Sequence, residues 1–93
     1  MSEETMIVQS DRMHLVAKAL RTELRRTILK LLSKRELDIT QLSENLEKSL
    51  SGIHEQIKIL EEAGLITSQY KPGTHGIRKI CRTSIKHVVF NLR

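Results

Sequence analysis

The sequence predicts a mostly helical α+β fold, and three observations support this fold class. Apolar residues recur at helical spacing through most of residues 10–63. Two short segments after residue 64 are rich in residues that favour strands, and a cluster of proline and glycine separates them. The chain has 93 residues, of which 39% are hydrophobic, with one Tyr and one Phe. This composition is typical of one domain, residues 1–93, with a modest core of Leu and Ile.

The first helix is expected to begin near Ser10, after an unstructured lead that covers residues 1–9. Ser10 or Asp11 can cap it, because a short polar side chain can accept a hydrogen bond from a free backbone N–H of the first turn. We expect the apolar face of this helix to consist of Met13, Val16, Ala17 and Leu20.

A second helix is expected over about residues 23–33. Thr22 is a good N-cap, and Glu23 lies favourably at the positive end of the helix dipole. The inner face of this helix is formed by Leu24, Ile28, Leu31 and Leu32. Its basic residues are expected to face outward; they are Arg25, Arg26 and Lys30. The two arginines can serve as surface residues, contact a partner subunit or touch a phosphate.

Residues 38–66 show the clearest pattern in the chain, two helices joined by a tight polar turn. The first helix spans about residues 40–46. The second begins after Ser49, which can cap it, and closes at Gly64, which can adopt the left-handed conformation that other residues avoid. Its apolar stripe is formed by Ile53, Ile57 and Leu60. This is a helix-turn-helix at about residues 40–63, in which the second helix can enter the major groove of DNA.

A β-hairpin, or wing, is expected over residues 65–82. Its strands cover about residues 65–70 and 77–82. Residues 71–76 form the turn, because they contain the only proline and two of the four glycines of the chain.

Residues 84–92 are compatible with two conformations. Val88, Phe90 and Leu92 alternate as in a strand, whereas the wider apolar pattern also fits a helix; the adjacent Val88 and Val89 favour the strand. Before this segment the predicted order of elements is α-α-β-α-α-β-β, in which the first strand is a short extended piece near residues 37–39.

The helix-turn-helix resembles that of the ArsR family of winged helix-turn-helix transcriptional regulators. The family pattern of LAxxL, vSxHL and LxxaGLv lies without a gap over residues 42–46, 53–57 and 60–66. The resemblance extends over about residues 15–92. Two positions depart from the pattern: His54-Glu55-Gln56 replaces the usual Ser-x-His, and Lys48 replaces an apolar turn residue.

The resemblance implies a winged helix-turn-helix with a three- to four-helix core and a small antiparallel β-hairpin wing. It also implies a transcriptional regulator that binds double-stranded DNA, acts as a homodimeric repressor and recognises a near-palindromic operator. In the family the first helix packs across the partner subunit, and a terminal helix is the usual dimer element. The first helix of this chain can equally cover only its own core. Longer relatives carry an effector domain after this segment, so the chain can also be the DNA-binding head of such a regulator.

Positive charge is concentrated after the helix-turn-helix. Residues 1–62 hold ten Lys/Arg and eleven Asp/Glu, whereas residues 63–93 hold six Lys/Arg and no acidic residue. A basic segment at this place is typical of an element that contacts a polyanion. A basic face can also simply aid solubility.

The residues expected to read DNA project from the face of the second helix opposite its apolar stripe. They are Ser51, His54, Glu55 and Lys58, with Ser49 near the phosphate backbone. His54 can donate to a guanine edge, and Lys58 can meet a phosphate or a guanine edge. Glu55 fits only opposite a cytosine amino group or beside a cation, because it would otherwise repel phosphate. Gln56 lies nearer the apolar stripe and can hydrogen-bond within the scaffold. The wing residues expected to contact phosphates or the adjacent minor groove are Lys71, His75, Arg78 and Lys79.

Other classes of function are less consistent with the sequence. A winged helix used to bind another protein would present apolar or aromatic anchors on its second helix, and the residues expected there are polar. An enzyme is not expected, because no Gly-rich phosphate loop and no plausible catalytic pair occur. The four histidines and the single cysteine are dispersed, so neither a metal nor another cofactor is expected.

The single cysteine and the lack of long apolar runs predict a cytoplasmic protein. Cys81 is expected to be a packed strand residue rather than a redox switch or a disulfide to a partner subunit. One cysteine gives no sign of an oxidising compartment, and no apolar run is long enough to span a membrane or to direct secretion.

Overall fold

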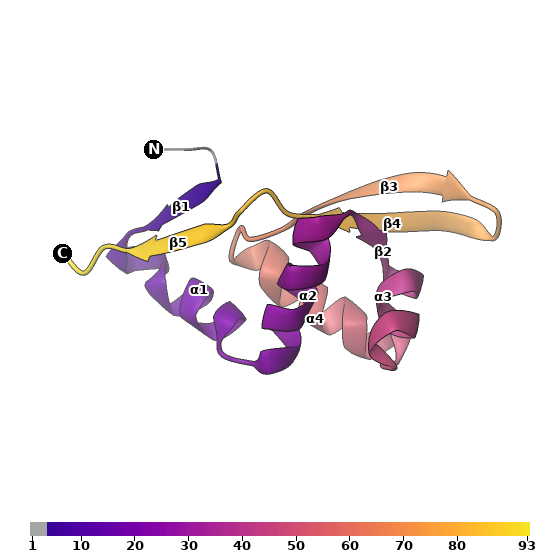
Figure 1. Ribbon diagram of the computed structural model, residues 1–93, viewed down its shortest axis with the longest axis horizontal. Helices are drawn as coiled ribbons and strands as arrows, with labels where there is room; N and C mark the ends of the chain where they lie inside the picture. The colour runs from indigo at the N-terminus through magenta and orange to yellow at the C-terminus, as the bar shows by residue number, and fades with distance from the viewer. Residues whose placement is uncertain (1–3) are drawn as a thin grey trace.

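A bundle of four α-helices forms the centre of the protein in the computed structural model, which describes residues 4–93 (Figure 1). The helices are α1 (Met13–Leu20), α2 (Glu23–Lys34), α3 (Ile39–Leu46) and α4 (Leu50–Glu62). The largest fully buried side chains of their core include Ile28, Leu42, Ile53, Ile57 and Leu60. The helix-rich winged helix-turn-helix fold predicted from the sequence is therefore confirmed.

Two predicted N-caps and one predicted C-terminal glycine are confirmed. Thr22 Oγ1 accepts a hydrogen bond from the backbone N–H of Arg25 at 3.3 Å, and Ser49 Oγ accepts one from Gly52 at 3.1 Å. Gly64 follows α4 with a φ of 76°. These contacts satisfy backbone groups that have no partner inside the helix, so local chemistry determines where α2 and α4 begin and where α4 ends.

The wing is an antiparallel hairpin that extends away from the helices (Figure 1). The strands of its sheet, in the spatial order β2-β4-β3, are β2 (Leu37–Asp38), β4 (Gly76–Arg82) and β3 (Thr67–Gly73). The strands are longer than predicted, because Gly73 pairs with Gly76 and only residues 74–75 form the turn. Gly76 has a φ of 112°, which favours glycine in such a tight hairpin. Pro72 is tolerated because β3 is an edge strand.

The two ends of the described chain meet in a second, parallel sheet at the opposite end of the molecule from the wing tip (Figure 1). β1 (Thr5–Val8) pairs with β5 (His87–Phe90). The strand alternative for the last segment is therefore confirmed. The unstructured lead predicted for residues 1–9 is wrong for residues 4–9, and residues 1–3 lie outside the described part. Val8, only 2% exposed, anchors β1 on the helical core, which a local sequence pattern does not reveal.

The start of the first helix also differs from the prediction. A 3₁₀ turn (Ser10–Arg12) precedes α1, and neither Ser10 nor Asp11 makes a side-chain cap hydrogen bond. Val16, Met13 and Leu20 of the predicted apolar face pack on the core, but the second fully buried residue of α1 is Ala19, whereas Ala17 is exposed. Within residues 4–93, no helix is long and apolar enough to cross a membrane.

Candidate DNA-binding surface

The outer face of α4 carries the polar side chains predicted to read DNA. Helical geometry places Ile53, Ile57 and Leu60 in the core, so the residues between them must face solvent. The exposed residues of this face are Ser51, His54, Glu55 and Lys58. In the described part of the chain, no hydrogen bond or ion pair holds the side chains of His54, Glu55 or Lys58. These three groups are therefore free to bind an external partner.

Ser49 has a structural task at the start of the same helix. Its hydroxyl caps α4 and lies 3.4 Å from Ser51 Oγ. A Cβ atom at position 52 would lie 3.0 Å from Ser49 Oγ, so glycine there keeps the cap in place. The first turn of α4 is exposed at residues 49–51, and the N-terminus of a helix is a favourable place for a phosphate.

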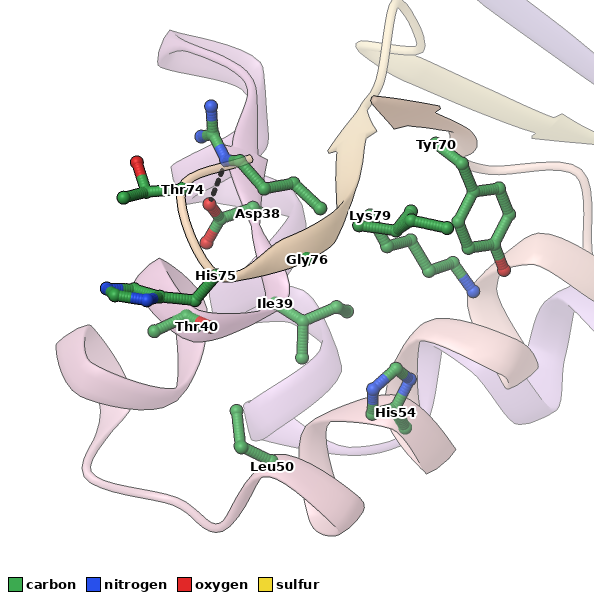
Figure 2. Close-up of a pocket in the computed structure, with 12 residues that line it drawn as sticks. Asp38, Ile39, Thr40, Leu50, His54, Tyr70, Thr74, His75, Gly76 and Lys79 are labelled. Atoms are coloured by element: carbon green, nitrogen blue, oxygen red, sulfur yellow. Dashed lines mark hydrogen bonds and ion pairs between the residues drawn. The ribbon is translucent and has the colours of Figure 1, made fainter. Parts of the chain in front are cut away.

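Arg78 joins the wing to α3 through Asp38. Arg78 Nε donates to Asp38 Oδ2 at 2.7 Å, the dashed line in Figure 2. The other carboxylate oxygen, Asp38 Oδ1, caps α3 by accepting from the backbone N–H of Gln41. Burial raises the pKa of Asp38, but the hydrogen bond from Gln41 and the Arg78 guanidinium outweigh burial, so the net pKa is below its ordinary value of 3.8. Arg78 retains 44% exposure of its side chain. Its terminal guanidinium nitrogens have no partner in residues 4–93, so they can still meet a phosphate.

Lys79 faces the helices instead of the solvent. Its ammonium donates to Glu61 Oε1 of α4 at 3.1 Å and lies 5.8 Å from the ring centre of Tyr70. Burial lowers the pKa of Lys79, but the hydrogen bond and the charge of Glu61 outweigh it and raise the net pKa above 10.5. With 14% of its side chain exposed, Lys79 ties the wing to α4. Adjacent strand residues point to opposite faces of the sheet. Arg78 and Lys79 therefore have different partners, Asp38 and Glu61, and only Arg78 remains exposed.

A groove of about 540 Å³ lies between α4 and the wing. Figure 2 shows Leu50 and His54 pointing into it from α4, opposite Tyr70 and Lys79 of the wing, with Ile39 between them. Leu50, the first residue of α4, is 52% exposed and was not among the predicted site residues. Its place four residues before His54, on the same side of the helix, is a sequence signal that identifies it. The groove thus combines donors with apolar surface.

Comparison with known proteins shows which family the chain belongs to. The model of the bacterial regulatory protein, arsR family, matches residues 22–68, which include the whole helix-turn-helix. The chain belongs to the ArsR family. It is therefore a transcriptional regulator with a winged helix-turn-helix DNA-binding domain. No curated protein matches the sequence significantly.

Solved structures show the same fold in other members of the ArsR family and in related regulators. Reduced HlyU from Vibrio cholerae is 27% identical, with a TM-score of 0.67 over 80% of this chain and 74% of that one. A homodimeric winged helix-turn-helix DNA-binding domain from Mycobacterium bovis is 26% identical, with a TM-score of 0.69 over 80% of this chain and 65% of that one. That domain is described as a possible ArsR-family transcriptional regulator.

Arg25 differs from its prediction in this ArsR-family chain. It was expected to face outward, but it is 5% exposed and links three helices. Its guanidinium donates to the carbonyls of Lys18 at 2.7 Å and Ala19 at 3.0 Å, and to Gln56 Oε1 of α4 at 2.8 Å. Five donors in a planar fork suit arginine to such a site. The scaffold role expected for Gln56 is thereby confirmed, and Arg25 is too enclosed to contact a phosphate.

Cys81 of the ArsR-family chain is a buried thiol. Cys81 is fully buried, and Ser68 Oγ lies 3.6 Å from its sulfur. Burial raises the pKa of the thiol, although the Ser68 hydroxyl partly offsets this effect. The thiol is thus shielded from a partner subunit and from oxidants. Among residues 4–93, no cluster of three or more His, Cys, Asp or Glu side chains is placed to hold a metal.

Proposed function

We propose that this regulator acts in the cytoplasm as a homodimeric repressor that places α4 in the major groove of a near-palindromic operator. The observation that carries the proposal is the outer face of α4, where His54, Glu55 and Lys58 are exposed and have no partner in residues 4–93. Unpaired polar groups on a helix that protrudes from a rigid scaffold are suited to hydrogen bonding with base edges.

Each exposed group has a chemistry that fits duplex DNA. His54 donates to guanine N7 or O6, Lys58 donates to a phosphate or to a guanine edge, and Glu55 accepts from a cytosine amino group. Ser51 donates to a phosphate beside the first turn of α4. Ser49 contributes mainly by capping the helix, because its hydroxyl already accepts from Gly52. The bases are thus read by the middle of the exposed face.

The wing supplies contacts that are independent of sequence. Lys71, His75 and Arg78 are exposed on it and can neutralise phosphates. Lys79 acts as a positioning residue that holds the wing against α4 through Glu61. These cations lie on the wing, next to α4, so the phosphates of one DNA strand can be bound between the wing and α4.

A two-fold homodimer explains how such a small surface can reach useful affinity. Two α4 helices would enter half-sites about one helical turn apart, so the operator would mirror the symmetry of the protein. The homodimeric domain from Mycobacterium bovis supports this arrangement. So does the apolar outer side of the β1–β5 sheet, where Ile7 and Val89 are exposed and paired.

Fluorescence anisotropy with random duplex DNA at two salt concentrations tests the proposal. Lys58→Ala and Lys71→Ala should each weaken binding and reduce the slope of log K against log salt by about one, because each removes one cation. Lys30→Ala is the matched control, since Lys30 is exposed on α2, away from α4 and the wing.

Binding that is equal in all three variants would contradict the assigned surface. Absence of binding at low salt by the folded wild-type protein would contradict the DNA-binding proposal and favour a protein partner for the groove. Repression itself is measured by transcription from a promoter that carries the selected operator, which should fall when the protein is added.

A further inference from the structure

The exposed large hydrophobic residues of the described chain fall into two separate groups. One group lies on or just after the β1–β5 sheet and consists of Ile7, Val89, Phe90 and Leu92. The other group lines the groove between α4 and the wing and consists of Leu50, Tyr70 and Ile77. Of these, Leu50 alone belongs to α4. An exposed apolar residue on the DNA-binding helix requires its own explanation, since the other exposed residues of α4 that face solvent beside it are polar.

Leu50 lies at the N-terminal end of the proposed recognition helix. Leu50 is the first residue of α4, is 52% exposed and lies between the exposed Ser49 and Ser51. It shares its side of the helix with His54, one turn later, and both point into the groove (Figure 2). In helix-turn-helix proteins, the N-terminal residues of the recognition helix contact the base edges.

The chemistry of the major groove offers one apolar group at a base edge, the C5-methyl of thymine. The other bases present an amino group or acceptor atoms there, and a leucine side chain can neither donate to nor accept from them. Packing Leu50 against those polar atoms would remove water from them without replacing its hydrogen bonds. Packing it against a methyl group buries apolar surface on both partners.

We propose that Leu50 reads a thymine, packing its side chain against the C5-methyl of one base in each half-site. This inference rests on the proposed function, because it requires α4 to lie in the major groove. Within that frame, Leu50 supplies a preference based on shape and hydrophobicity, while His54, Glu55 and Lys58 supply preferences based on hydrogen bonds. The recognition helix thus reads neighbouring bases by two kinds of contact.

Replacement of thymine by deoxyuridine tests the inference, since it removes only the methyl group. Duplexes are first selected from a random pool by the wild-type protein, and each thymine of the consensus is then replaced in turn. At one thymine per half-site, wild-type binding should weaken about fourfold, the factor that corresponds to one buried methyl group. Leu50→Ala should bind the thymine and deoxyuridine forms of that site equally.

Ile77→Ala is the matched control. Ile77 lines the same groove and is exposed, but it lies on the wing rather than on α4. This variant should keep the fourfold preference for thymine, whatever its overall affinity. A second variant, Leu50→Gln, should shift the selected base at this position toward adenine, because glutamine pairs with the N6 and N7 atoms of adenine. Circular dichroism establishes that all variants are folded.

The outcomes separate this inference from the proposed function. If the wild-type protein selects a consensus but no thymine is sensitive to deoxyuridine, DNA binding stands and the role of Leu50 is refuted. Equal sensitivity in wild type and Leu50→Ala also refutes it. If the folded wild type enriches no duplex, both the proposed function and the role of Leu50 are refuted.

Discussion

At the scale of single residues, Arg25 shows how a charged side chain can organise a helical core. Its guanidinium donates to two carbonyls near the end of α1, those of Lys18 and Ala19, and it also holds Gln56 of α4. The Lys18 carbonyl also accepts from the backbone N–H of Arg21, whereas the Ala19 carbonyl lies in the last turn, where helix geometry leaves such groups without a partner inside the helix. Gln56 lies beside the exposed face of α4, so the same contact helps to fix the orientation of that face. Arg25 thus links stability to the geometry of the DNA-binding helix.

Replacement of Arg25 tests this role. Arg25→Ala should lower the free energy of unfolding by about 2–3 kcal/mol, because it leaves the Ala19 carbonyl and Gln56 Oε1 without this donor and removes a buried side chain. Arg25→Lys should recover only part of the loss, since one ammonium cannot reproduce the planar fork. Urea unfolding followed by circular dichroism measures both effects.

Arg26→Ala is the control for Arg25. Arg26 is the exposed neighbour in sequence and makes one hydrogen bond, to the carbonyl of Leu20 at 2.7 Å. Its replacement should cost less than about 1 kcal/mol. If Arg25→Ala and Arg26→Ala lower the free energy of unfolding equally, the buried contacts of Arg25 do not contribute more to stability than the exposed contact of Arg26.

At the scale of elements, Asp38 connects β2, α3 and the wing. Its carboxylate caps α3 as part of a capping box with Gln41, and it also binds Arg78 of β4. The spacing of Asp38 and Gln41, three residues apart before an apolar helix, is a sequence signal for this box. The contact with Arg78 spans 40 positions and has no local signal. One carboxylate thereby caps α3 and ties the wing to the start of that helix.

The pH dependence of Asp38→Asn separates these two roles. Asparagine is also a good N-cap, so the substitution keeps the cap and removes the ion pair. The pKa of Asp38 is below 3.8 in the folded protein, so the charged form favours folding. This contribution is present above the unfolded-state pKa and is lost as the pH falls through the lower folded-state pKa.

Wild type should therefore exceed Asp38→Asn in unfolding free energy by about 1 kcal/mol at neutral pH, since Arg78 is partly exposed and water screens the pair. The difference should shrink as the pH falls below 3.8. Urea unfolding at a series of pH values measures this difference. A gap that is constant over the whole acid range would exclude the ion pair as its source.

At the scale of the whole molecule, the protein is elongated, with principal extents of 48 × 24 × 20 Å. The wing occupies one end and the β1–β5 sheet the other (Figure 1). A two-stranded sheet is marginally stable alone, and here its inner side, which includes Met6 and Val88, packs on the helical core. Its outer side leaves Ile7 and Val89 exposed. This side is the best candidate for contact between two copies of the chain.

Val89→Asp tests this dimer surface. A carboxylate on the outer side of the sheet would be buried without a partner in the dimer, so the variant should be monomeric at concentrations where the wild type is dimeric. Sedimentation equilibrium measures the oligomeric state. The monomer should also lose most of its preference for a palindromic site over a single half-site.

Ile77→Asp provides the comparison for Val89→Asp. It introduces the same charge at an exposed apolar residue of the wing, and it should leave the oligomeric state unchanged. If Val89→Asp remains as dimeric as Ile77→Asp, the β1–β5 sheet is not the dimer contact.

The helix-turn-helix, its caps at Thr22 and Ser49, Gly64 and the wing were all predictable from the sequence by itself. Each depends on residues within about one helical turn or one hairpin of each other, where spacing along the chain determines proximity in space. The exposed polar face of α4 follows from the same spacing, which is why the predicted recognition-helix residues lie together.

Other features were decided only by the tertiary structure. β1 has its partner at the far end of the chain, Arg25 is buried because acceptors from two other helices surround it, and Lys79 turns from the solvent to Glu61. In each case a residue of ordinary local pattern meets a partner that is distant in sequence. Propensity and periodicity describe neighbours along the chain, whereas burial and ion pairing depend on which elements pack together in space.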